Sequence, residues 1–195
     1  MNSLVAFEAI LAVCCLITIN LARQAFFPAS LFWAFGAVSV GIMAVLGGLT
    51  YAGFTEVDAF HLTAKRVAGS MGLASFTLGA IAGLFAGFFN RFCWGILLTS
   101  VVALCILLLL GLWRVSTDVQ MGMVGIIFLI GLVRLISSGM LALYLILGVV
   151  FLVLSDVAVK WLASNTGLDG MNIYHILLSL AVVSFGLSAS RDEWD

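Results

Sequence analysis

Residues 92–113 read FCWGILLTSVVALCILLLLGLW, and no Asp, Glu, Lys, Arg or His interrupts them. A helix needs about 20 predominantly apolar residues to cross the hydrocarbon core of a bilayer. This stretch meets that requirement in both length and composition, so it predicts a transmembrane helix.

The rest of the chain repeats the pattern. Six further stretches are apolar over a comparable length: residues 3–22, 29–54, 59–89, 119–136, 140–163 and 171–188. Of the 195 residues, 64% are hydrophobic and 9% are charged, whereas an ordinary soluble domain has about 25% charged residues. We therefore predict an all-α integral membrane bundle of seven transmembrane helices, which forms a single transmembrane domain over residues 1–195.

Charge and small residues bear on the partners. The formal net charge is −1 and no polybasic run is present. Membrane lipids are therefore the expected partners, and nucleic acid is not expected.

A ridge of small residues lies in the third span, where Ser75, Gly79, Gly83 and Gly87 follow one another at intervals of four residues. Such a ridge lets another helix approach closely. It predicts either a contact inside the bundle or the seam of a homo-oligomer or of a partner membrane subunit.

The polar residues inside or beside the spans gather at one side of the membrane. Because the seven spans alternate in direction, the N-terminal end of the chain lies at one face, here called face A, and the C-terminal end at the other, face B. The candidates near face A are Glu8, Asp58, His61, Lys65, Asp156, Lys160, Asn172 and His175. A charge within the bilayer costs several kcal/mol and usually faces a partner or a hydrated cavity. We therefore predict a polar pocket at face A.

Helical spacing orders part of this group into two stripes. Asp58, His61 and Lys65 are spaced i, i+3, i+7 at the start of the third span. Asn172, His175 and Ser179 repeat that spacing in the seventh. Residues spaced in this way share one side of a helix. The two histidine-bearing stripes are therefore candidates to face each other.

Each of these residues also has a structural explanation. Asp156 precedes Lys160 by four residues, the order that favours an intrahelical salt bridge. Lys65 and Arg134 lie near helix ends, from which long basic side chains reach the headgroups. Glu8 lies one to two turns inside the first helix, where it can reach interfacial water.

A metal site would use both histidines of the chain. Two neutral imidazoles and one carboxylate make a three-ligand set that leaves the fourth position of zinc for water. Asp58 is the nearest carboxylate in sequence, so His61, His175 and Asp58 are the predicted zinc ligands, with Asp156 as a candidate base. Zinc lowers the pKa of bound water to about 7 and so supplies a nucleophile for amide or ester hydrolysis. No other cofactor is predicted.

A family resemblance points in the same direction. Seven helices, a histidine at the start of the third, and Asn172-Ile-Tyr-His175-Ile-Leu-Leu-Ser179 in the last resemble the membrane hydrolase superfamily of alkaline ceramidases and progestin/adipoQ receptors, together with bacterial seven-helix proteins. In that superfamily a His-x-x-x-His pair and an earlier histidine hold zinc for lipid amide hydrolysis. His175 matches the first histidine of the pair, Ser179 stands at the position of the second, and His61 corresponds to the earlier one.

The resemblance implies a metal-dependent hydrolase of lipid amides or esters in the cytoplasmic membrane of a bacterium. Asp58, Asp156 and Ser179 are then the catalytic candidates, and Glu8, Lys65, Lys160 and Asn172 complete the pocket. Two other classes of function need no metal. A hydrated pocket could pass protons, ions or a small solute, and a glycine-ridged bundle could serve as a small subunit of a larger membrane complex.

Overall fold

The computed structural model of the protein describes residues 3–85, 90–157, 159–167 and 169–192, apart from the side chains of Arg91 and Lys160. Within these residues the regular structure is helical, without a strand, and seven segments are long and apolar enough to cross a membrane. The predicted all-α membrane bundle is confirmed. The elements are α1 (Ser3–Ala22), α2 (Ala29–Tyr51), η1 (Thr55–Val57), α3 (Asp58–Val67), η2 (Ala68–Gly72), α4 (Leu73–Phe85), α5 (Arg91–Leu109), α6 (Thr117–Arg134), α7 (Gly139–Val157), α8 (Val159–Thr166) and α9 (Gly170–Ala189).

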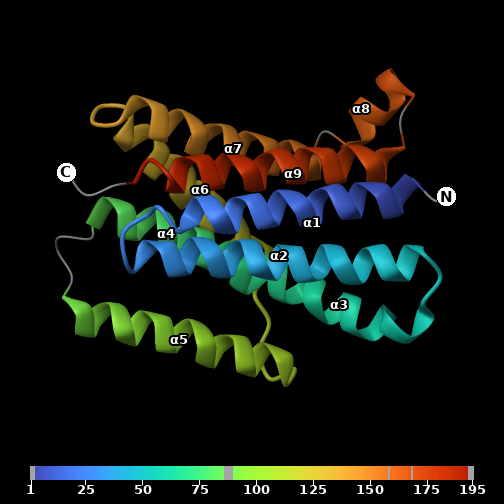
Figure 1. The fold of residues 1–195 in the computed structure, drawn as a ribbon, viewed down its shortest axis with the longest axis horizontal. Coiled ribbons are helices and arrows are strands. Elements are labelled where there is room, and N and C mark those ends of the chain that lie inside the picture. The colour runs from blue at the N-terminus through green and yellow to red at the C-terminus, as the bar shows by residue number, and fades with distance from the viewer. Residues whose placement is uncertain (1–2, 86–89, 158, 168, 193–195) are drawn as a thin grey trace.

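Six of the spans pack into a closed ring. Helix α1 lies between α2 and α9, and the ring continues from α2 through α4, α6 and α7 back to α9. The first and last spans are thus neighbours, and the two chain ends lie at opposite ends of the bundle (Figure 1). Helix α5 lies at the edge of the bundle (Figure 1), where the ring of Trp94 packs on that of Phe32 with centroids 6.2 Å apart.

The third span departs from the single helix predicted over residues 59–89. Between α3 and α4 lies the π-helical turn η2, a wider turn that is often found at functional sites. Glycine is needed within it, because a Cβ at Gly72 would collide with the Ser39 hydroxyl of α2. That hydroxyl donates to the Gly36 carbonyl at 2.7 Å. Gly87 and the predicted end of the helix at residue 89 lie outside the described residues.

The sixth span was predicted over residues 140–163. The structure has α7 up to Val157 and α8 from Val159, on either side of residue 158, which lies outside the described residues. The last residues of α8, Ser164, Asn165 and Thr166, are polar, and their side chains bond carbonyls of the preceding helical turn at 2.7–2.8 Å. Asp156 lies on α7 and Lys160 on α8. The side chain of Lys160 is outside the described residues, so the Asp156–Lys160 salt bridge stays a prediction.

Three aromatic rings fill the middle of the bundle. Trp33, Phe76 and Phe185 come from α2, α4 and α9, and their centroids lie 5.1–6.1 Å apart. Each ring packs on a glycine of another helix, since a Cβ at Gly79 would lie 2.8 Å from Trp33, one at Gly36 2.7 Å from Phe76, and one at Gly148 2.5 Å from Phe185. The small residue at each contact allows the helices to approach closely.

Replacing Gly148 by alanine is expected to lower the free energy of unfolding by about 1–3 kcal/mol, because the added methyl group displaces the buried Phe185 ring. Gly125→Ala on α6 is the matched control, since a Cβ there meets no atom within 4 Å. In the control, the better helix propensity of alanine is expected to leave stability unchanged or slightly raised. Thermal unfolding of the two variants in one detergent measures the difference, and equal midpoints would contradict the packing.

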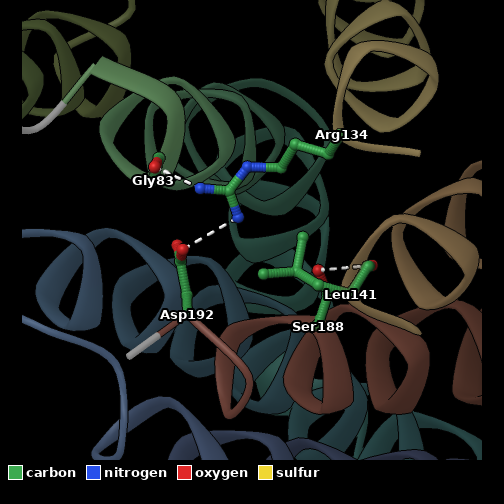
Figure 2. Close-up of polar contacts among 5 residues, drawn as sticks. All are labelled: Gly83, Arg134, Leu141, Ser188 and Asp192. Carbon is green, nitrogen blue, oxygen red and sulfur yellow. Dashed lines mark hydrogen bonds and ion pairs between the residues drawn. The ribbon is translucent and has the colours of Figure 1, made fainter. Parts of the chain in front are cut away.

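At face B a buried ion pair joins three parts of the chain (Figure 2). Arg134 at the end of α6 donates from Nη1 to Asp192 Oδ1 at 2.8 Å and from Nη2 to the carbonyl of Gly83 in α4. Nearby, the Ser188 hydroxyl of α9 donates to the Leu141 carbonyl of α7 at 3.2 Å. Arg134 is thus buried and paired, so the expectation that it extends to the headgroups is wrong.

Candidate functional site

The contact between the first and last spans brings a carboxylate and an imidazole together. Glu8 Oε1 lies 3.0 Å from His175 Nε2, and both side chains are almost completely buried, with 2% and 3% of their surface exposed. The other ring nitrogen, Nδ1, lies 2.6 Å from the carbonyl oxygen of Met171 one turn earlier. A carbonyl oxygen can only accept a hydrogen bond, so Nδ1 carries a proton and donates it.

This arrangement fixes the number of protons in the pair. With Nδ1 protonated, a second proton must lie between Nε2 and Oε1, because two lone pairs at 3.0 Å would repel each other. The pair is therefore either imidazolium with carboxylate or imidazole with carboxylic acid. In both forms its net charge is zero, which lowers the cost of burying it among apolar helices.

The second histidine lies against the same pair. A Cβ built on Gly47 of α2 would lie 2.8 Å from Glu8 Cδ and 3.2 Å from His61 Nε2, so both side chains reach the same point on α2. His61 is half-buried, and its ring meets that of Tyr51 edge-on with centroids 6.2 Å apart. Glu8 Oε2 and Thr50 Oγ1 are buried without a hydrogen-bond partner among the described residues. His61 and Glu8 thus meet at Gly47 of α2, and Glu8 in turn contacts His175.

A cavity of about 700 Å³ lies beside this cluster, lined by α2, α3, η2, α4, α6, α7 and α9. Its inner part is apolar and includes Val40, Met43, Leu178, Val182 and the aromatic rings of Phe76 and Phe185. Its part near face A is polar and includes Lys65, Arg66, Thr117, Gln120, Asp156 and Tyr174. Tyr174 also touches the His175 ring, with centroids 5.3 Å apart. Tyr174 therefore borders both the cavity and the His175 ring.

The length of the cavity can be gauged along α9. Tyr174 and Phe185, which both line it, are eleven residues apart, and a rise of 1.5 Å per residue gives about 16 Å between them. The hydrocarbon core of a bilayer is about 30 Å thick. The cavity therefore extends from face A to about the middle of the membrane.

Two of the other predicted site residues line the cavity, and the remaining described ones lie outside it. Lys65 and Asp156 are exposed and line the cavity. Asp58 is exposed in the first turn of α3, where a carboxylate suits the positive end of the helix dipole. The Asn172 amide donates to the Ser3 hydroxyl at 3.2 Å, and the Ser179 hydroxyl to the His175 carbonyl at 2.7 Å. The side chain of Lys160 lies outside the described part.

The predicted zinc ligands are not gathered into one set. Among the described residues, no three His, Cys, Asp or Glu side chains are grouped so that they could hold a metal ion. Asp58 is exposed, and the Nε2 of His175 is engaged by Glu8 instead. Zinc remains a prediction of the sequence, and the arrangement of these side chains adds no support to it.

The comparisons with known proteins do not assign the protein to a class, so its class is defined by the fold. No family model, curated protein or solved structure matches the chain. The seven apolar helical spans define a multi-pass membrane protein of the all-α class. The predicted resemblance to the ceramidase and adipoQ-receptor superfamily remains an expectation.

Proposed function

We propose that the protein binds a membrane amphiphile in the cavity, with the apolar chain of the ligand in the inner part and its polar head near face A. The observation that carries the proposal is the change of lining along the cavity, from aromatic and aliphatic side chains to Lys65, Arg66 and Asp156. Ligand sites are commonly apolar with a few placed polar groups. The reach of about 16 Å matches a molecule that occupies one leaflet.

The polar end favours a head with one anionic group. Lys65 and Arg66 follow each other on α3 and both line the cavity, and a guanidinium forms strong paired hydrogen bonds with phosphate or carboxylate oxygens. Gln120 of α6 adds a neutral amide. Asp156 of α7 lines the same end and would repel a second negative charge. We place this site in the cytoplasmic membrane of a bacterium, following the sequence resemblance.

Hydrolysis of the bound lipid is a separate, further step of this proposal. It follows from the resemblance to lipid amide hydrolases, and turnover of a lipid amide or ester by the purified protein would test it. Binding alone requires only the cavity and its charged end.

The binding proposal is tested with a fluorescent alkyl phosphate and the matching uncharged alkyl alcohol, added to protein in nanodiscs. Replacing both Lys65 and Arg66 by alanine is expected to weaken binding of the phosphate about tenfold or more, since charge-assisted hydrogen bonds contribute about 1.5–3 kcal/mol each. Binding of the alcohol should change little. Leu178→Trp, which fills the apolar part, should weaken both ligands.

Arg23→Ala is the matched control, because Arg23 is an exposed arginine beyond the other end of α1. It is expected to leave the affinity for the alkyl phosphate unchanged. Equal binding of the phosphate by the wild-type protein, the double variant and Leu178→Trp would contradict the proposal.

A further inference from the structure

The walls of the cavity differ in how far they are exposed. The residues of α2, α4 and α9 that line it are buried or half-buried. Facing the cavity does not by itself expose a side chain, since Val40 and Phe76 line it and are 6% and 4% exposed. The exposed lining residues therefore mark the mouth of the cavity. They belong to α3, η2, α6 and the end of α7: Leu62, Lys65, Arg66, Gly69, Thr117, Met121, Asp156 and Val157.

The mouth lies where the third span separates from α6. Near face B the two are held together, because α4 packs on α6 and Arg134 donates to the Gly83 carbonyl. Towards face A, α3 packs mainly on α2 and to a smaller extent on α5. No residue of α5 within the described part of the chain lines the cavity. The gap between α3 and α6 is therefore not closed by the helix that connects them in sequence.

The mouth extends into the hydrocarbon core of the membrane. Gly69 lies close to the midpoint of the third span, Thr55–Phe85, and the middle of a span lies in the hydrocarbon, where water is absent. A Cβ at Gly69 would meet no atom within 4 Å, so the space beside this glycine is open. Met121 of α6 is the exposed apolar residue on the other wall. The cavity thus opens onto the lipid of the leaflet at face A.

We propose that the anionic amphiphile enters the cavity sideways from the face A leaflet, through the mouth between η2 and α6. Its head passes along Lys65 and Arg66 while its chain passes between Gly69 and Met121. An amphiphile in that leaflet already has its head at the interface and its chain in hydrocarbon. Sideways entry therefore exposes neither part to an unfavourable environment. This inference rests on the proposed binding function and adds the source of the ligand, which is the membrane and not the surrounding water.

Gly69→Trp tests the route, because it places a large ring in the mouth. The φ angle of Gly69 is not positive, so tryptophan can adopt its backbone conformation. In nanodiscs, uptake of the fluorescent alkyl phosphate and its release to unlabelled alkyl phosphate are both expected to slow about tenfold or more, within the range of association rates among variants of one site. The equilibrium affinity should change little, because a narrowed route alters the rates and not the bound state. Met121→Trp narrows the mouth from the opposite wall and should act in the same way if Gly69→Trp does not fold.

Gly122→Trp is the matched control. Gly122 is also an exposed glycine of a span, a Cβ there meets no atom within 4 Å, and it does not line the cavity. Its tryptophan variant should keep the wild-type rates.

The outcomes separate this inference from the binding proposal. Wild-type rates in folded Gly69→Trp and Met121→Trp would overturn sideways entry, although the cavity would still bind the ligand. Weaker binding without slower uptake and release would also overturn it, because the tryptophan would then occupy the site and not the route. Failure of the wild-type protein to bind the alkyl phosphate would instead contradict the proposed function, and this inference with it.

Discussion

Arg134→Ala is expected to lower the free energy of unfolding by about 3–5 kcal/mol, because it removes one partner of a buried ion pair and leaves the other uncompensated. The guanidinium accounts for the 2.8 Å contact with Asp192 Oδ1 and also donates to the Gly83 carbonyl. Its loss therefore separates α4, α6 and the residues that follow α9 (Figure 2). Chemical unfolding of the purified variant measures the loss.

The size of that loss should depend on pH. Burial raises the pKa of the Asp192 carboxyl, and the Arg134 guanidinium opposes the rise. A carboxyl with a raised pKa in the folded protein stabilises it at low pH, and this stability is lost as the pH rises through the folded pKa. Without Arg134 the pKa rises further, so the variant should be most destabilised at neutral pH. Its deficit should shrink towards about pH 4, where ordinary carboxyls begin to protonate.

The double variant Arg134→Ala/Asp192→Asn is the control for the unpaired charge. It removes the carboxylate that the single variant leaves behind, so it should recover a large part of the lost stability at neutral pH. A double variant no more stable than Arg134→Ala, or a single variant as stable as the wild type, would show that the pair does not hold these segments together.

Gly47→Ala is expected to lower the free energy of unfolding by about 3 kcal/mol, since overpacking and the distortion of a buried pair act together. The methyl group would meet the carboxyl of Glu8 and lie 3.2 Å from His61 Nε2. The Glu8 carboxyl must then shift, which disturbs its 3.0 Å contact with His175 between α1 and α9. Thermal and chemical unfolding report the cost, and the ¹⁵N spectrum of His175 reports the altered contact.

The neighbouring glycine provides a matched control. A Cβ on Gly48 would lie 3.5 Å from Glu8 Cβ, an ordinary van der Waals distance. Gly48→Ala should therefore leave stability unchanged or raise it by up to about 1 kcal/mol through helix propensity. If both alanine variants behave alike, Glu8 does not pack on Gly47 as described.

Hydropathy alone predicted where the seven spans lie, but not the π-helical turn within the third span. The first span was predicted over residues 3–22, the same range as α1. The π-helical turn η2 was not predicted, because an apolar run has the same composition whether its hydrogen bonds follow an α or a π pattern. Gly79 and Gly83 were read as a ridge for close contact. They pack on Trp33 and on the pair of Arg134 and Asp192 within the bundle, while an oligomeric seam remains a prediction.

Within the site, the alternating direction of the spans placed the two histidines at face A and helical spacing assigned each to a stripe, but neither identified the carboxylate beside His175. Asp58 was chosen as the carboxylate closest in sequence to His61, whereas the structure places Glu8 against His175, and beside the same glycine, Gly47, as His61. That pairing depends on the contact between α1 and α9, which are far apart in the sequence, so no local sequence pattern predicts it. Glu8 itself gave one signal, because it is the only Asp, Glu, Lys or Arg in residues 3–22.

The closure of the ring also has a consequence for biosynthesis. Helix α1 is synthesised before the other six described spans, and the partner of its carboxylate is in α9, the latest of the seven. An unpaired carboxylate within a span costs several kcal/mol in a bilayer, so α1 is less stably inserted in the membrane until α9 has been synthesised. Docking of α9 removes that cost, whereas a chain that stops before α9 keeps an unpaired acid inside the membrane.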